Sequence, residues 1–168
     1  MLLKAIEFIS LVLTALVMGV FWGTWFTLTR SLDTFSPAEF IHIGKTIIAN
    51  VGTPMSILMP ATLVAMFLAI VLAFRFRWAD ARNSDQRPYL YLASFLLMIV
   101  TLVITLTVLV PIDNQLATWT PETLPSNWIE FRQTWDLYHT AHTARTFTSI
   151  ASLAAFALGT ITGQSRRH

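Results

Sequence analysis

Four long stretches of the chain contain no Asp, Glu, Lys or Arg. Each is close to or longer than the roughly 20 apolar residues that a helix needs to cross about 30 Å of hydrocarbon. These stretches cover residues 8–29, 46–74, 88–112 and 146–165. They are continuously apolar rather than alternating, which favours helices over the strands of a membrane barrel. We therefore predict an all-α integral membrane protein, an antiparallel four-helix transmembrane bundle in a single domain. Its spans are expected at about 6–29, 46–74, 89–111 and 141–164.

Two of the connections between the spans run into amphipathic stretches. In the first, polar residues from Ser36 to Thr53 recur at three- and four-residue spacing, which is one helical face. Ser36-Pro37-Ala38-Glu39 has the pattern of a capped helix start, so the second helix should begin near residue 37. The fourth helix should begin near residue 127, and Pro111 is expected to end the third helix. The bundle therefore carries two amphipathic helical extensions on one side of the membrane.

Composition and charge set the membrane orientation. Hydrophobic residues make up 55% of the chain and charged residues only 12%, roughly half the usual charged share of a soluble domain. Seven of the basic residues fall on the side that holds both chain ends: Lys4, Arg75, Arg77, Arg82, Arg87, Arg166 and Arg167. The positive-inside rule then predicts cytoplasmic termini, in a bacterial inner membrane, with the polar extensions on the outer face.

The same composition excludes several kinds of site and partner. The chain has no cysteine, which excludes thiolate-bound zinc, cysteine-bound iron–sulfur clusters and cysteine nucleophiles. No basic patch is interleaved with aromatic residues, so nucleic acid is not an expected partner. The lipid bilayer is the first partner that the sequence implies.

The richest polar cluster enters the fourth span. His139 and His142 are three residues apart on one helical face, and Arg145 lies one turn deeper. Ionisable residues at membrane depth are costly and usually face the bundle interior, so these three indicate a polar pocket in the outer leaflet. The alternative is an interfacial helix whose histidines and arginine extend to the lipid headgroups.

A third histidine, His42, makes a metal site a second possibility for the histidines. If the second and fourth helices pack together, His42 could complete a three-histidine metal site with His139 and His142, or these residues could ligate a haem. The alternative for His42 is an interfacial residue that only packs or forms hydrogen bonds.

A third cluster follows the third span. Asp113 and Asn114 come directly after Pro111, and either turn chemistry or a functional role explains them. Tryptophans near the membrane interface anchor a protein in the bilayer, and they can equally wall a flat ligand. The candidate substrate-binding residues are Trp22, Trp25, Asn50, Trp119 and Trp135.

The second half of the chain resembles a known family. The resemblance rests on Pro111-Ile112-Asp113-Asn114, Trp119-Thr120, Leu124-Pro125, Trp128, Arg132, Trp135 and His142-Thr143-Ala144-Arg145-Thr146. These residues are similar to those of the anthrone oxygenase-like family of small four-span membrane proteins. The resemblance implies oxidation of an anthrone-like substrate to a quinone by molecular oxygen, with a flat, apolar, phenolic substrate that reaches the site from the membrane. It also implies that the polar pair of the family corresponds to Asp113 and Asn114, and the histidine–arginine pair to His142 and Arg145.

One hypothesis follows for the chemistry. His142, assisted by His139, would remove a proton from the substrate carbon, while Arg145 and Asn114 stabilise the enolate. Asp113 would orient a histidine, tryptophans would flank the rings, and no cofactor would be required.

Two other hypotheses remain open from the sequence. In the first, the protein is a haem- or metal-binding redox protein that uses His42, His139 and His142. In the second, it is a non-catalytic small membrane subunit. Small residues such as Gly19 and Gly23 are compatible with association, including a homo-oligomer.

Overall fold

The computed structural model describes residues 1–29, 34–79, 85–120, 122–123 and 128–165. Within these residues the chain is helical and has no strand, which confirms the predicted all-α class. The elements are α1 (Leu2–Gly23), the π-helical η1 (Thr24–Thr29), α2 (Pro37–Ala79), α3 (Arg87–Ile104), the π-helical η3 (Thr105–Leu109), α4 (Val110–Thr118) and α5 (Trp128–Ser165). In the described part of the chain, four helical stretches are long and apolar enough to cross a membrane: Leu2–Thr27, Ile41–Arg77, Arg87–Thr118 and Thr140–Thr162.

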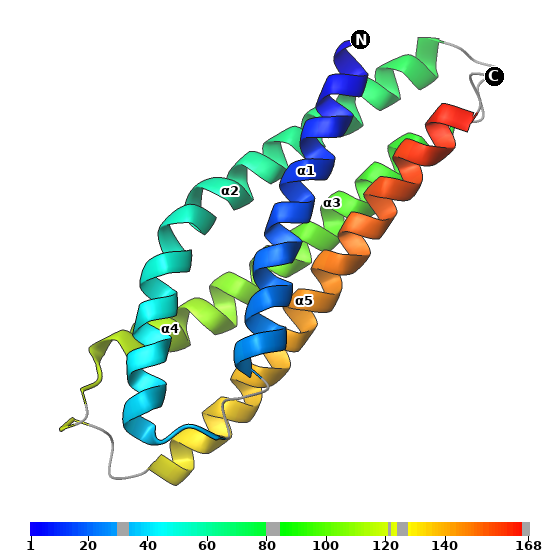
Figure 1. Ribbon diagram of the computed structural model, residues 1–168. Helices are drawn as coiled ribbons and strands as arrows, with labels where there is room; N and C mark the ends of the chain where they lie inside the picture. The colour runs from blue at the N-terminus through cyan, green and yellow to red at the C-terminus, as the bar shows by residue number, and fades with distance from the viewer. Residues whose placement is uncertain (30–33, 80–84, 121, 124–127, 166–168) are drawn as a thin grey trace.

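The four long helices form an antiparallel bundle (Figure 1). The start of α1 and the last turns of α5 lie at one end, and α4 and the start of α5 lie at the other. The most extensive contact joins α3 to α5, while α1 packs against both α2 and α5. The buried face of α1 repeats at four- and three-residue spacing from Leu3 to Phe21, which is the spacing of helices that pack nearly parallel. Each helix therefore presents one face to a shared core.

Small hydroxyl side chains join the helices in this core. Ser94 of α3 donates to the Ser152 carbonyl of α5 at 2.6 Å, and Ser152 donates back to the Ser94 carbonyl at 2.8 Å. Thr101 and Thr148 share a hydrogen bond of 2.8 Å one level further along. Such residues let backbones approach closely, and in a membrane close packing and hydrogen bonds replace the hydrophobic effect between helices.

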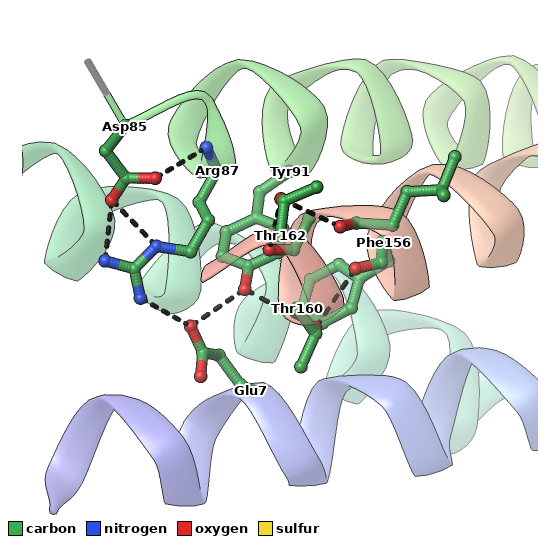
Figure 2. A network of polar contacts seen from close by, with 9 residues as sticks. Glu7, Asp85, Arg87, Tyr91, Phe156, Thr160 and Thr162 are labelled. Carbon is green, nitrogen blue, oxygen red and sulfur yellow. Dashed lines mark hydrogen bonds and ion pairs between the residues drawn. The ribbon is translucent and has the colours of Figure 1, made fainter. Parts of the chain in front are cut away.

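A buried ionic network fixes the end of the bundle nearest the chain termini (Figure 2). Tyr91 donates to Glu7 at 2.8 Å, and Arg87 lies 3.6 Å from the same carboxylate oxygen. Arg87 also pairs with Asp85 at 2.6 Å. Tyr91 can approach α5 because Gly159 has no side chain: a Cβ there would lie 2.6 Å from the Tyr91 ring. This network sets the rotation of α1 relative to α3, since buried charges are stable only when paired.

The helix starts agree with the sequence. α2 begins at Pro37 behind a capping box, in which the Ser36 N–H donates to the Glu39 carboxylate at 2.9 Å and the Glu39 N–H donates back to the Ser36 hydroxyl oxygen at 3.4 Å. The Ser36 hydroxyl also donates to the Glu39 carboxylate at 2.7 Å. These hydrogen bonds from Ser36 lower the pKa of Glu39 below its usual value of 4.5. α5 begins at Trp128, next to the predicted residue 127.

The expectation that Pro111 ends the third helix is wrong. The helical path continues from α3 through η3 into α4, and Pro111 occupies the first turn of α4. Proline is tolerated in a first turn because that turn has no intrahelical acceptor for its N–H. The π-helical turn of η3 shifts the hydrogen-bond register ahead of the proline, which gives Pro111 this position. Asp113 is therefore carried on a helix instead of in a turn.

Candidate functional site

A cavity of about 480 Å³ lies in the half of the bundle away from the chain termini. Its lining comes from α1, η1, α2, α3, η3, α4 and α5, so all four membrane-spanning segments contribute to its walls. The lining residues are Val20, Phe21, Thr24, Gly44, Ile47, Ile48, Val51, Gly52, Met55, Ser56, Met59, Pro60, Leu102, Thr105, Leu106, Val110, Asp113, Leu116, His142 and Arg145. Such a mostly apolar cavity with a few polar groups is the usual form of a small-molecule site.

Among the described residues, three ionisable side chains line this mostly apolar space. His142 and Arg145 come from α5 and are 4% and 7% exposed, and Asp113 comes from α4 and is half-buried. A buried arginine within a membrane-spanning helix is costly and is typical of a functional site. The structure thus brings together the histidine, the arginine and the carboxylate that the sequence analysis selected from two distant segments.

The hydrogen bond between His142 and Arg145 defines the protonation of the histidine. Nη2 of Arg145 lies 2.7 Å from Nδ1 of His142. A guanidinium has only donors, so Nδ1 must accept this bond. The imidazole is then neutral, with its proton on Nε2. His142 consequently offers an N–H donor on its other nitrogen.

Contacts with α1 hold Arg145 in place. Its guanidinium lies over the ring of Phe21, 4.1 Å from the centroid, which is a cation–π arrangement. The Thr146 hydroxyl, one residue along α5, donates to the His142 carbonyl at 2.8 Å and is 3.3 Å from the Phe21 carbonyl. The cation is therefore positioned by packed neighbours from two helices, which reduces the cost of organising it for a ligand.

Irregular helical backbone contributes to the cavity walls, and the pattern of apolar and charged stretches did not predict it. Thr24 belongs to η1 and Thr105 to η3, and both π-helical segments line the space. On the facing wall, α2 contains Pro54 and Pro60 within its length and changes direction partway along (Figure 1). In membranes, interrupted helices are tolerated where they are buried in protein or line a cavity. The prolines and Gly52 within one apolar stretch were the signal that could have identified this wall.

Several predicted site residues are placed elsewhere. Asn50 and Asn114 are exposed, and Trp119 is buried at the end of α4. The structure describes all three residues, and none of them lines the cavity. The side chains of His139 and Trp135 lie outside the described part of the chain.

The two tryptophans of α1 and η1 pack on the bundle surface. Trp25 donates from Nε1 to the Thr143 hydroxyl at 2.9 Å and meets Phe147 edge-on. Trp22 is 41% exposed and stacks on Phe26. Neither tryptophan lines the cavity, whereas the sequence predicted both as substrate-binding residues. The contacts of Trp25 attach the end of the first span to α5.

The metal hypothesis finds no support in the described residues. Among their side chains, no group of three His, Asp or Glu residues could hold a metal ion. His42 is exposed on α2 and is not in the lining of the cavity that contains His142. The polar face of the α2 extension is thus turned away from the site, because apolar residues of α2 pack inward.

Comparison with known proteins gives one match. A family model described as anthrone oxygenase matches residues 49–157, well over half of the chain and the region that contributes most of the cavity lining. No curated protein and no solved structure matches the chain.

Proposed function

Because the chain belongs to the anthrone oxygenase family, we propose that it is a membrane-embedded oxygenase that oxidises an anthrone-like, phenolic or polycyclic aromatic substrate in this cavity. The observation that carries the proposal is the His142–Arg145 pair, buried in the lining of a mostly apolar space of about 480 Å³. A flat apolar ring system suits the apolar walls, and its carbonyl or phenol oxygen suits this polar pair. From the basic residues, we place this end of the bundle toward the outer face, with both termini in the cytoplasm.

The protonation of His142 favours separate residues for oxyanion stabilisation and for proton removal. Arg145 and the Nε2–H of His142 are donors, which suits them to stabilise the oxyanion of an enolate. The sequence-based hypothesis gave proton removal to His142, but a proton on Nδ1 would remove the acceptor that Arg145 uses and place two cations side by side. Asp113 lines the same cavity and is an acceptor when ionised, so we assign proton removal to it.

The reaction balances with oxygen as the only co-substrate. Asp113 takes one proton from the methylene carbon of the substrate, which leaves an enolate. The enolate passes one electron to O₂, and the resulting radical and superoxide combine, with the returned proton, to a hydroperoxide. This hydroperoxide loses water as the C=O bond forms. Overall, one CH₂ group and one O₂ become one C=O group and one H₂O.

Anaerobic hydrogen exchange tests the base without the oxygen steps. In D₂O, the wild-type protein should catalyse deuterium incorporation at the methylene carbon of an anthrone in detergent or vesicles. Asp113→Asn should reduce this exchange by about 10²–10⁴-fold, the usual contribution of a general base. Exchange that survives in Asp113→Asn but is lost in His142→Ala would return the base role to His142.

Oxygen uptake and quinone absorbance test the whole reaction. Arg145→Met should reduce turnover by about 10²–10³-fold, the usual cost of one oxyanion donor. Ser149→Ala is a matched control, because Ser149 is buried on the same helix, donates only to the Thr146 carbonyl and is outside the cavity lining. Equal losses in both variants would show that the effect is structural and would contradict the site.

A further inference from the structure

We propose that the cavity opens sideways into the hydrocarbon core through an entrance between α2 and η3, with Ser56, Pro60 and Leu106 at its rim, and that a ligand dissolved in the membrane enters there. The identity of that ligand as a flat aromatic carbonyl or phenol rests on the proposed function. The entrance itself rests on the exposure, depth and surroundings of the lining residues.

The exposure of the lining residues differs between the two sides of the cavity. On the side of α1 and α5, Phe21, His142 and Arg145 are 2%, 4% and 7% exposed, so this side is closed. On the other side, Leu106 is 56% exposed, and Ser56 and Pro60 are also exposed. Residues that line a cavity and also reach the molecular surface mark its opening. The opening therefore lies between the middle of α2 and η3.

The depth of the rim places this opening within the hydrocarbon. Leu106 is seven residues from Asp113, the nearest ionisable residue of its span, which is about 10 Å of helix. With a tilt of about 30°, it still lies about 9 Å deeper than Asp113. Ser56 is 11 residues from Lys45, the nearest charged residue of its span, or about 16 Å of helix. Lipid tails, not water or headgroups, surround such positions.

The surface beside the rim is apolar. Ile57 follows Ser56 on α2 and is 68% exposed, and Val103 precedes Leu106 by one turn and is 50% exposed. Neither residue lines the cavity. A charged or strongly hydrated molecule would lose its water at such an entrance, so the structure selects a ligand that partitions into lipid.

The backbone on both rims is able to adjust. Pro60 lacks the N–H that would bond the carbonyl of Ser56, so the helix is weakened at the rim. On the other rim, Leu106 lies within the π-helical η3, which ends at Leu109. Because His142 and Arg145 lie on the closed side, a ligand that enters between these segments meets them with its leading polar end.

Blocking the rim tests the entrance. The double variant Ser56→Phe with Leu106→Phe adds two rings at the opening. The matched control, Ile57→Phe with Val103→Phe, adds two rings to the neighbouring exposed surface, and neither variant changes the tryptophans. The probe is anthracene carried in phosphatidylcholine vesicles, which are mixed with proteoliposomes of each variant in a stopped-flow instrument. The rate of tryptophan quenching reports entry without any turnover.

The rim variant should bind the probe about tenfold more slowly than the wild type, with the control within about twofold. Leu106→Ala, which widens the opening, should bind it faster and provides a second test if the ring variant folds poorly. Equal entry rates in the wild type, the rim variant and Leu106→Ala would overturn the entrance. Rates that depend on the rim in a protein that takes up no oxygen with anthrones would support the entrance and refute the proposed function.

Discussion

Gly52 provides a test of the cavity that separates ligand binding from folding. It lies on α2 in the cavity lining, and a Cβ atom built there meets nothing within 4 Å. Gly52 is exposed on the same face of α2 as Ser56 and Pro60, so a side chain at this position would extend into the mouth of the cavity that we assign to the substrate. Gly19 has the same open surroundings but is outside the lining, so it serves as the matched control.

The magnitude follows from the volume. A leucine at position 52 adds four carbon atoms, and at about 30 Å³ each, the volume share of one water molecule, these occupy roughly 120 Å³. This is about a quarter of the 480 Å³ cavity. Replacing a helical glycine also stabilises a helix by about 0.5–1 kcal/mol when no clash occurs. Gly52→Leu should thus leave the thermal unfolding midpoint unchanged or raised, while it weakens substrate binding.

The assay pairs thermal unfolding with substrate turnover. Gly52→Leu should raise KM for a three-ring substrate by about tenfold or more, which corresponds to at least about 1.4 kcal/mol of lost binding. Gly52→Ala should have a smaller effect on KM, and Gly19→Leu should leave KM unchanged while its unfolding midpoint, like that of Gly52→Leu, stays the same or rises. A Gly52→Leu protein that unfolds at a lower temperature would refute the reasoning about open space. An unchanged KM would show that the substrate does not occupy this cavity.

Three further predictions concern folding. Gly159→Ala should lower stability by about 1–3 kcal/mol, because its Cβ would lie 2.6 Å from the Tyr91 ring, and a chemical or thermal unfolding curve that matches the wild type would contradict this packing. Glu7→Ala should lower the free energy of unfolding by about 1–3 kcal/mol, because it takes the carboxylate acceptor from the buried Tyr91 hydroxyl while Arg87 keeps its pair with Asp85, and calorimetry should show a smaller loss for Glu7→Gln, which keeps an acceptor for Tyr91. The capping hydrogen bonds hold the pKa of Glu39 below 4.5, so their contribution is present above that value and is lost as the pH falls through the lowered pKa. Amide exchange in the first turn of α2 should accelerate over that range, whereas exchange that follows only the intrinsic pH dependence would argue against the cap.

Much of the fold is predictable because its determinants are local. A long apolar stretch requires a spanning helix whatever surrounds it, and the capping residues before Pro37 specify where α2 begins. The continuation of the helix through Pro111 was not predictable in the same way. Its tolerance depends on the π-helical turn of η3, and that turn is set by packing between helices, not by the proline itself.

Some residues of the candidate site were likewise predictable from local sequence, and others depended on tertiary packing. His142 and Arg145 were recognisable because two polar residues three apart at membrane depth need a polar environment. His42 and Asn50 formed an equally regular polar face, but the structure leaves them exposed. The rotation of α2 decides this difference, and it follows from the tertiary packing of apolar residues such as Met59, which is 5% exposed. No periodicity within one helix specifies which of its faces meets a neighbour.

Isotope labelling tests the central claim most directly. Proteoliposomes with wild-type protein are supplied with ¹⁸O₂ and an anthrone, and the quinone product is examined by mass spectrometry. The proposed reaction predicts one ¹⁸O atom in the new carbonyl group, formed at a rate that falls sharply in Arg145→Met and stays near the wild-type rate in Ser149→Ala. A quinone that carries oxygen from water, or a rate that is the same without the protein, would contradict the assignment of this cavity as an oxygenase site.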